Sequence, residues 1–216
     1  MVELSPVQAF DALADTWKQG TPGIVCGAGH EYKFEGRPTA GVTELLKAVG
    51  LNDYSHVPEG ILERAQRRGQ YVHLCTQFID EGKLNWTTLD ETLKGYSRAY
   101  VAFRDSVNYR PGVVEAPFYS KAFDYAGTPD RVCMINGVCG ILDFKSSVTP
   151  NRDDALQTAG YYILVRENIP TIGCKKRWRL QLRADGTFRL TEFTNLEKDL
   201  RVFLASREIY AWKQAA

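Results

Sequence analysis

The sequence predicts an α/β domain with a mixed central β-sheet flanked by helices. Two observations predict this fold class. Segments with helical apolar spacing alternate with β-branched runs, in the order helix, strand, hairpin, helix and strand pair. A chain of 216 residues is also long enough for one domain with a full core. We expect an N-terminal helix and hairpin extension over 1–57, a core over 58–193 and a C-terminal helix over 194–216.

Charge and cysteine usage limit the possible functions. The formal net charge is +1, so any surface for a polyanion must be a local patch. The five cysteines are scattered without C-x-x-C spacing, which predicts reduced, mostly buried thiols in an intracellular protein. The N-terminus lacks a basic segment followed by an apolar run, and no stretch approaches the length of a membrane span. We therefore expect a cytoplasmic protein without membrane contact.

The first 57 residues are predicted to contain two helices and a hairpin. Ser5 is a suitable N-cap, and Pro6 a suitable first residue, for an amphipathic helix over 5–18. The Gly-rich segment 21–29 lacks the Gly-Lys-Ser/Thr ending of a phosphate-binding loop and is predicted to be an ordinary loop. Residues 32–38 are typical of a small hairpin, and a helix is expected from about 43 to 49.

Two longer helices are predicted next, over 58–79 and 88–107. The buried stripe of the first is expected to comprise Ile61, Leu62, Ala65, Val72, Cys75 and Ile79. Gly69 inside this helix costs about 1 kcal/mol relative to Ala, which suggests close approach of another backbone or a ligand. His73 flanks the stripe, and a lone histidine there is more often structural than a metal ligand. The tyrosines of the second helix are expected to pack in the core.

A strand is predicted over 112–120, and it contains Glu115. A single acid in an apolar strand is costly to bury unpaired. We expect its partner to be a metal ion or Lys145, or else a salt bridge at the strand end.

The residues most informative about function surround Asn136-Gly137, the strongest short-range signal for a two-residue hairpin turn. This turn places Asp130 opposite Asp143, about 5 Å apart at Cβ. Side chains alternate along a strand, so Lys145 projects from the same face as both acids. A divalent cation such as Mg²⁺ or Mn²⁺ would compensate for their closeness. An ordinary salt-bridge patch is the alternative, but the buried character of both strands favours a site. The same register pairs Ile135 with Val138, Met134 with Cys139, and Val132 with Ile141.

After the hairpin, a helix capped by Thr149 or Asn151 is expected to reach about Glu167. Gln157 and Tyr161 are four residues apart and share one face of that helix.

A last hairpin over 176–193, turning at Asp185-Gly186, and a helix over 196–212 are predicted to complete the chain. Six basic residues and one acid lie between 175 and 189, which makes this hairpin the best local surface for a polyanion. Protection of an edge strand by charged side chains is the alternative.

Four motifs, ordered along residues 68 to 161, resemble those of the PD-(D/E)XK nucleases. The segment from Gly127 to Asp130, thirteen residues before Asp143-Phe-Lys145, resembles the core motif. Arg68-Gly69 with His73 resembles the R-G-x-x-x-H helix motif of the RecB-like and phage exonuclease branch, and Gln157 to Tyr161 resembles its Q-x-x-x-Y motif.

The resemblance implies a metal-dependent exonuclease that hydrolyses phosphodiester bonds from DNA ends, in phage or bacterial recombination or repair. Lys145 would position or deprotonate the attacking water and offset charge on the phosphate. The implied ligands of one or two Mg²⁺ or Mn²⁺ ions are Asp130, Asp143, His73, Glu115 and the Phe144 carbonyl. The residues implied to position or contact DNA are Arg68, Gln157, Tyr161, Lys175, Lys176, Arg177 and Arg179.

The resemblance also bears on cofactors and partners. The imidazole ligand favours Mn²⁺ without excluding Mg²⁺. Some relatives hold an iron-sulfur cluster with one early cysteine and a late cysteine group, but only Cys174 lies late here, so no cluster is expected. A recombination protein is a candidate partner, and no subunit interface can be identified from the sequence.

Two alternatives stay open. A catalytically silent DNA-binding protein of the same fold would bind DNA in a salt-dependent way without cleaving it. The intact acid pair and Lys145 argue against it. An endonuclease of the same superfamily would cut closed circular DNA, whereas an exonuclease needs an end. The sequence contains no recognisable base-reading element, which favours the exonuclease.

Overall fold

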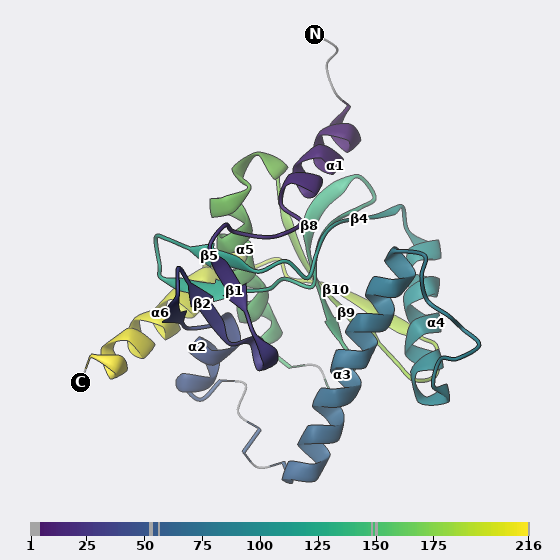
Figure 1. The fold of residues 1–216 in the computed structure, drawn as a ribbon, viewed down its shortest axis with the longest axis horizontal. Helices are drawn as coiled ribbons and strands as arrows, with labels where there is room; N and C mark the ends of the chain where they lie inside the picture. Colours follow the sequence, from purple (N-terminus) through teal and green to yellow (C-terminus); the bar gives the residue numbers. More distant parts are fainter. Residues whose placement is uncertain (1–4, 52–53, 56, 148, 150, 216) are drawn as a thin grey trace.

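The computed structural model describes residues 5–51, 54–55, 57–147, 149 and 151–215. Its centre is a five-stranded sheet with helices on both faces (Figure 1). Neighbouring strands are antiparallel except for β8 and β9, which are parallel, so the sheet is mixed. The predicted fold class, a mixed central sheet flanked by helices, is confirmed. In spatial order the strands are β10 (Phe188–Glu192), β9 (Lys176–Leu182), β8 (Val138–Lys145), β7 (Arg131–Ile135) and β4 (Tyr109–Val114).

Both faces of the central sheet are covered by apolar side chains of helices. Helices α3 (Glu59–Asp80) and α4 (Glu91–Ser106) cover one face, where Tyr100 and Phe103 pack in one cluster with Phe144 of β8. The predicted core role of the α4 tyrosines is therefore confirmed for Tyr100. Helices α1 (Pro6–Thr16) and α5 (Asp154–Asn168) cover the other face, and α2 (Val42–Ala48) and α6 (Leu196–Gln214) pack with α5. Strand β8 is buried on both sides as a result.

Two small sheets lie beside the main one. Strands β1 (Ile24–Cys26), β2 (Tyr32–Phe34) and β3 (Arg37–Thr39) form the first, and β5 (Phe118–Ser120) and β6 (Tyr125–Gly127) form the second. The hairpin predicted over 32–38 is confirmed. The loop predicted over 21–29 is wrong, because β1 and the start of a short 3-10 helix, η1 (Ala28–His30), lie there. Two of the three β1 residues are exposed, so the strand has no apolar alternation that would predict it.

The single strand predicted over 112–120 is also wrong. Strand β4 ends at Val114, and β5, which belongs to another sheet, begins at Phe118. Between them Glu115 has a φ of 48°, in the left-handed region that a non-glycine residue rarely adopts. Pro117 follows and has no N–H for a strand ladder. The chain therefore turns out of the central sheet at Glu115.

Local signals in the sequence located most helices correctly. Ser5 caps α1 in a capping box with Gln8, and α6 matches the predicted C-terminal helix. Helix α5 starts later than expected, with Asp153 at its N-cap, because the Asn151 side chain instead accepts a hydrogen bond from the Asp153 backbone. No helix in the described part of the chain is long and apolar enough to cross a membrane.

The apolar stripe predicted on α3 is correct only in its second half. Val72 and Cys75 are buried there, whereas Ile61 in the first half is 51% exposed. The first half of α3 extends away from the body of the molecule (Figure 1). The five cysteines are all unbonded, and four of them are buried, which confirms the expectation of mostly buried thiols.

Glycines inside α3 and α4 meet different surroundings. A Cβ at Gly95 of α4 would lie 1.7 Å from the Ala184 carbonyl oxygen, so α4 and the β9–β10 turn approach closely there. A Cβ at Gly69 of α3 would come no closer than 3.8 Å to the Ser146 Oγ. No described backbone approaches Gly69 closely, so the expected backbone approach occurs instead at Gly95, whereas approach of a ligand at Gly69 stays a prediction.

These surroundings predict opposite effects of the same substitution. Gly69→Ala should raise the free energy of unfolding by up to about 1 kcal/mol, because a helical glycine is replaced where there is room. Gly95→Ala should lower it by about 2 kcal/mol or more, because the helix and the turn must separate. Urea unfolding followed by circular dichroism measures both. Equal destabilisation by the two variants would contradict this packing.

Candidate metal centre

The central hairpin forms in the predicted register. Asn136 and Gly137 both have positive φ, and Ile135 faces Val138. The ladder continues to Arg131, one residue after Asp130. Asp130 itself turns inward, and its Oδ2 accepts a hydrogen bond of 2.6 Å from the Phe144 backbone N–H, the residue after Asp143. The two acids therefore lie side by side at the end of β7 and β8.

Both acids are shielded from solvent. Asp130 is 6% exposed and Asp143 is 1% exposed. Burial raises the pKa of Asp143, the Lys145 ammonium lowers it and Asp130 raises it again, with a net value of about 7. The Lys145 Nζ lies 2.7 Å from the Asp143 Oδ2, as expected for side chains that share one face of β8. The predicted cluster of two acids and a lysine is present.

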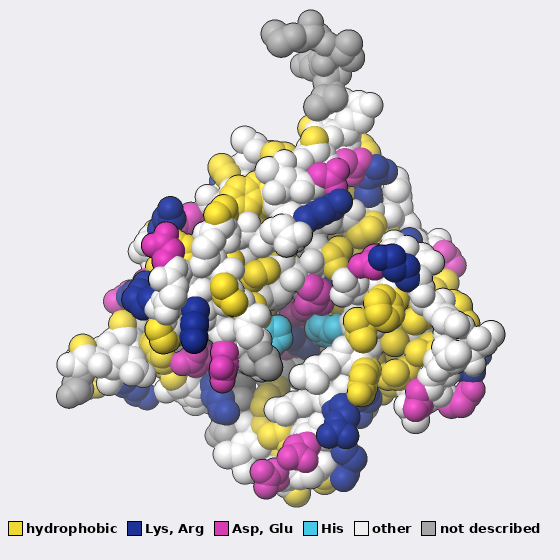
Figure 2. Space-filling view, viewed as in Figure 1, with side chains coloured by type: hydrophobic (Ala, Val, Ile, Leu, Met, Phe, Trp, Pro, Cys, Tyr) yellow, Lys and Arg dark blue, Asp and Glu magenta, His cyan; other side chains and the backbone are white. Residues whose placement is uncertain are grey.

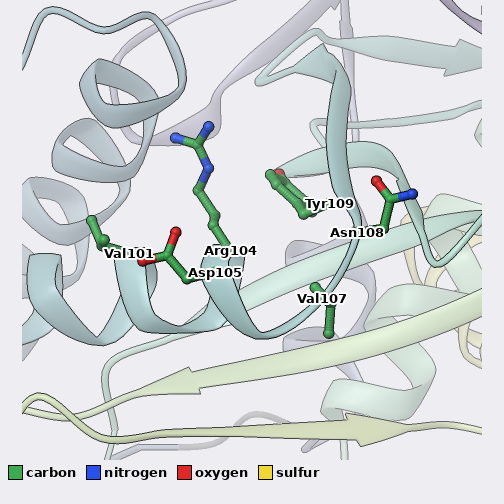
Figure 3. Close-up of a pocket in the computed structure, with 6 residues that line it drawn as sticks. All are labelled: Val101, Arg104, Asp105, Val107, Asn108 and Tyr109. Atoms are coloured by element: carbon green, nitrogen blue, oxygen red, sulfur yellow. The ribbon is translucent and has the colours of Figure 1, made fainter.

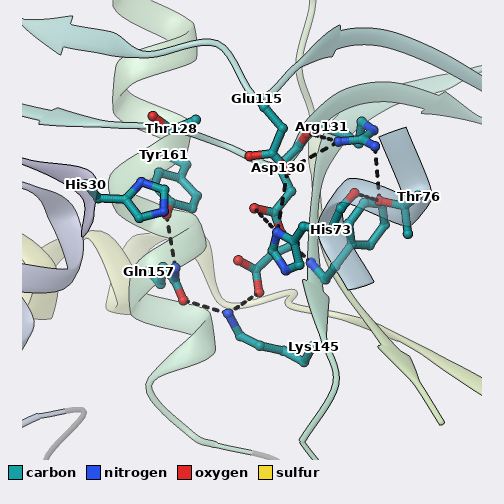
Figure 4. A network of polar contacts seen from close by, with 12 residues as sticks. His30, His73, Thr76, Glu115, Thr128, Asp130, Arg131, Lys145, Gln157 and Tyr161 are labelled. Carbon is teal, nitrogen blue, oxygen red and sulfur yellow. Dashed lines mark hydrogen bonds and ion pairs between the residues drawn. The ribbon is translucent and has the colours of Figure 1, made fainter. Parts of the chain in front are cut away.

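A donor set for a cation lies at the same end of the sheet (Figure 4). The ligand atoms of His73, Glu115 and Asp130 all lie within 4.8 Å of one another. The His73 Nδ1 is 3.4 Å from the Asp130 Oδ1 and 3.5 Å from the Glu115 Oε1. One imidazole nitrogen and two carboxylates are a suitable set for a divalent cation. These three residues could therefore hold a metal ion.

The electrostatics of His73 support the same interpretation. Burial lowers the pKa of its imidazole, but the Asp130 and Glu115 carboxylates outweigh burial and raise that pKa to about 9. Without a metal, His73 therefore carries a proton at neutral pH and supplies the positive charge that the carboxylates need. A divalent cation would replace that proton.

Two predicted metal ligands lie beside this donor set. Asp143 is paired with Lys145, and Phe144 contributes its backbone N–H to Asp130. Ligation by Asp143 and by the Phe144 carbonyl stays a prediction.

Arg131 fixes the relative positions of the elements that carry these ligands. Its side chain is fully buried, and its Nε lies 2.9 Å from the Asp80 Oδ2 of α3. Its Nη1 donates to the Asp130 carbonyl at 2.6 Å and reaches Glu115 at 3.5 Å. Its Nη2 donates to Thr76 Oγ1 of α3 at 3.1 Å. One guanidinium thus joins α3, which carries His73, to the backbone of Asp130 and to the Glu115 corner.

A hydrogen-bonded chain leads from the acids into α5. The Lys145 Nζ donates to the Gln157 Oε1 at 2.9 Å, and the Gln157 Nε2 donates to the Tyr161 Oη at 3.0 Å (Figure 4). Tyr161 is buried, so its hydroxyl orients Gln157 rather than facing solvent. Burial opposes the charge on Lys145, but Asp143, Asp154 and Asp130 outweigh it and raise the pKa of the ammonium.

Besides Arg131 and Asp80, two further residues of this region were not predicted from the sequence. Asp154 is buried between Lys145, at 3.8 Å, and Arg179, at 3.1 Å. The one sequence feature that could have indicated Asp154 is its place in the acidic pair Asp153-Asp154, which follows Asp143-Phe-Lys145. His30 lies near Tyr161 and Gln157 (Figure 4), and its Nδ1 is 3.2 Å from the Tyr32 hydroxyl. Nothing in its spacing connects it with the other site residues.

The predicted polyanion surface on the 176–193 hairpin is wrong for Arg177 and Arg179 of its first strand, which are buried. Strand β9 is an inner strand whose residues after Lys176 are all buried, because helices also cover both faces of the sheet there. Arg177 is 2% exposed and pairs with Asp199, and Arg179 is 6% exposed and pairs with Asp154. Lys176 is partly exposed and pairs with Glu192. Lys175 is exposed to solvent. Arg68 is partly buried on α3, and its Nε has no hydrogen-bond partner among the residues that the structure describes.

The surface is hollowed at the candidate site. Figure 2 shows acidic and histidine side chains in this hollow, between α3 and the small N-terminal sheet. A second hollow, at the junction of α4 and β4, is lined by Arg104, Asp105 and Tyr109 among others (Figure 3). None of its lining residues belongs to the candidate site.

Comparisons with known proteins do not identify the family. No family model matches the chain, and no curated protein matches its sequence. One similar solved structure is the crystal structure of a protein from Eubacterium rectale named a "putative exonuclease". It has 16% sequence identity and a TM-score of 0.43, over 95% of this chain and 84% of that chain. Such low similarity establishes neither a shared fold nor a shared activity.

The raised pKa of His73 predicts pH-dependent metal binding. A metal ion must displace the proton, so Mn²⁺ affinity should rise as the pH increases from about 7 to about 9. His73→Ala should bind Mn²⁺ more weakly and show a smaller rise over this interval. Isothermal titration calorimetry at several pH values measures this dependence. An affinity that is independent of pH in the wild type would contradict metal binding at His73.

Proposed function

We propose that this chain is a divalent-metal-dependent deoxyribonuclease with a PD-(D/E)XK core, acting as an exonuclease on DNA ends. The observation that supports this most is a convergence in space. His73 of α3, Asp130, Asp143 and Lys145 of the hairpin, and Gln157 of α5 belong to one polar network. These residues carry all four motifs that suggested a nuclease. A salt-bridge patch at a sheet end would not require residues from all these elements to meet.

The proposed cofactor is Mg²⁺ or Mn²⁺. His73, Glu115 and Asp130 would hold it, with Asp143 as a further ligand, and the imidazole favours Mn²⁺. A bound divalent cation would polarise the phosphate and make the attacking water more acidic. The buried acids would hold this cation at the position proposed for the phosphate.

Lys145 would act as a charged hydrogen-bond donor. Because the surrounding acids raise its pKa, it keeps its proton at neutral pH. It is therefore suited to stabilise negative charge on the phosphate and unsuited to remove a proton from water. This argument favours one of the two roles expected for Lys145. Gln157 and Tyr161 would hold the ammonium in position.

The wider setting follows from the same assignment. DNA ends are the proposed substrate, and Arg68, whose buried Nε has no hydrogen-bond partner among the described residues, is the proposed phosphate contact on α3. A bacterial or phage-infected cell, recombination or repair, and a recombination protein as partner are proposals that rest on the motif resemblance.

Cleavage assays with substitutions at the acid and the lysine test this function. Linear and closed circular DNA are incubated with Mn²⁺, Mg²⁺ or EDTA. Asp143→Ala and Lys145→Ala should each lower the cleavage rate about a hundredfold or more, because the first removes a proposed metal ligand and the second removes the positive charge proposed to stabilise the phosphate. Lys198→Ala, which changes an exposed lysine of α6, should retain the wild-type rate. Circular dichroism verifies that each variant is folded.

The two DNA forms separate the alternatives. Metal-dependent loss of linear DNA alone supports the exonuclease. Cleavage of closed circles would identify an endonuclease. Tight binding without cleavage in any metal would identify a silent DNA-binding protein, and full activity of either site variant would refute the proposed site.

A further inference from the structure

Helix α3 exposes an apolar stripe beside the candidate metal centre. Tyr71 is 50% exposed, Leu74 is 42% exposed and Phe78 is 36% exposed. Their spacing of three and four residues places them on one face of the helix. Single exposed apolar residues are common, but a continuous row of large ones indicates a contact surface. Figure 2 shows hydrophobic side chains gathered over α3, next to the hollow.

Basic residues extend this stripe towards the start of α3. Arg67 and Arg64 lie about one and two turns before Tyr71, respectively, on the same face of the helix. Both are exposed, and neither forms an ion pair with any residue that the structure describes. Their charge is therefore available to a ligand. Cationic and aromatic side chains combined on one surface are suited to a polyanion with exposed rings.

The position of the stripe connects it with the metal centre. His73, which lies between Tyr71 and Leu74 in the sequence, points from another side of the helix towards Asp130. The wall of the hollow and the stripe are thus two sides of one helix. A nucleic-acid strand that leaves the metal centre and passes around α3 would meet the stripe.

The chemistry of the stripe distinguishes between forms of nucleic acid. A duplex presents phosphates and sugars to a helix and keeps the faces of its bases stacked inside, so exposed rings would gain little from it. A single strand presents base faces that can stack on aromatic side chains, and its phosphates can pair with arginines. Tyr71 and Phe78 are separated by about 10 Å along the helix axis, with Leu74 between them. This length accommodates more than one base.

We propose that this face of α3, formed by Arg64, Arg67, Tyr71, Leu74 and Phe78, binds a single-stranded nucleic-acid segment that leads to the metal centre. We call it the α3 track. The direction towards the metal centre rests on the proposed nuclease function. The α3 track thus specifies a substrate with an unpaired end.

Binding without cleavage tests the α3 track. Full-length protein in EDTA is titrated into a fluorescent oligothymidylate and into a hairpin duplex, and anisotropy is recorded. The double variant Tyr71→Ala/Phe78→Ala should bind the single strand about tenfold more weakly and the duplex as the wild type does. Tyr71→Phe should retain single-strand affinity because the ring is kept. Trp212→Ala removes another exposed ring, 75% exposed on α6, and should change neither affinity.

The arginines have a separate readout. Arg64→Gln/Arg67→Gln should reduce the slope of log affinity against log salt concentration for the single strand by about 1.4, since each phosphate contact contributes about 0.7. The same measurement on Tyr71→Ala/Phe78→Ala should leave the slope unchanged, because stacking releases no counterions.

Several outcomes would overturn the α3 track. Unchanged single-strand affinity in the aromatic double variant would do so, and so would an equal loss for both DNA forms. Self-association of the wild type that the double variant lacks, seen by sedimentation, would assign this face to a second copy. Single-strand binding that depends on Tyr71 and Phe78, with no cleavage in any metal, would retain the track and remove the nuclease. Metal-dependent cleavage, together with single-strand binding that these substitutions do not change, would retain the nuclease and remove the track.

Discussion

Mutual repulsion among acids at one end of the central sheet is the constraint on which the site depends. Asp130, Asp143 and Asp154 are buried there, with Glu115 beside them. Carboxylates packed this closely need positive charge nearby. The other charged groups of the region meet that need: Lys145 lies against Asp143, Arg179 lies against Asp154, and the proton on His73 serves Asp130 and Glu115. Of these compensating charges, the His73 proton is the one that a cation can readily replace.

Buried ion pairs also determine the shape of this region. Removing one partner from such a pair is costly because it leaves an uncompensated charge in the interior. Arg131 and Asp80 form such a pair, and the other donors of Arg131 reach Thr76 and the chain around Asp130. These contacts of Arg131 hold α3 against the sheet in the position in which His73 faces the acids. The apolar row on another side of α3 stays half-exposed.

The sequence predicted those features that depend on local geometry. The turn at Asn136-Gly137 and the alternation along β8 suffice to place Asp143 and Lys145 on one face. The errors concern long-range arrangement. Arg177 is buried because α5 and α6 pack over that face of β9, where its guanidinium reaches Ala155 and Asp199, and no local pattern indicates those neighbours. Glu115 reaches His73 because the chain turns at Glu115 itself, which has a left-handed backbone conformation. Asp154 is a partner of Lys145 because α5 packs on the sheet.

Anomalous diffraction from crystals soaked in Mn²⁺ tests the central claim most directly, because it locates the ion independently of activity. We expect a peak within coordination distance of the His73 imidazole and the Glu115 and Asp130 carboxylates, and we expect it to disappear in His73→Ala/Asp130→Ala crystals. Absence of a peak at this position in the wild type, with Mn²⁺ bound elsewhere or not at all, would contradict the account. The acids would then be a structural network compensated by Lys145, Arg131 and a protonated histidine.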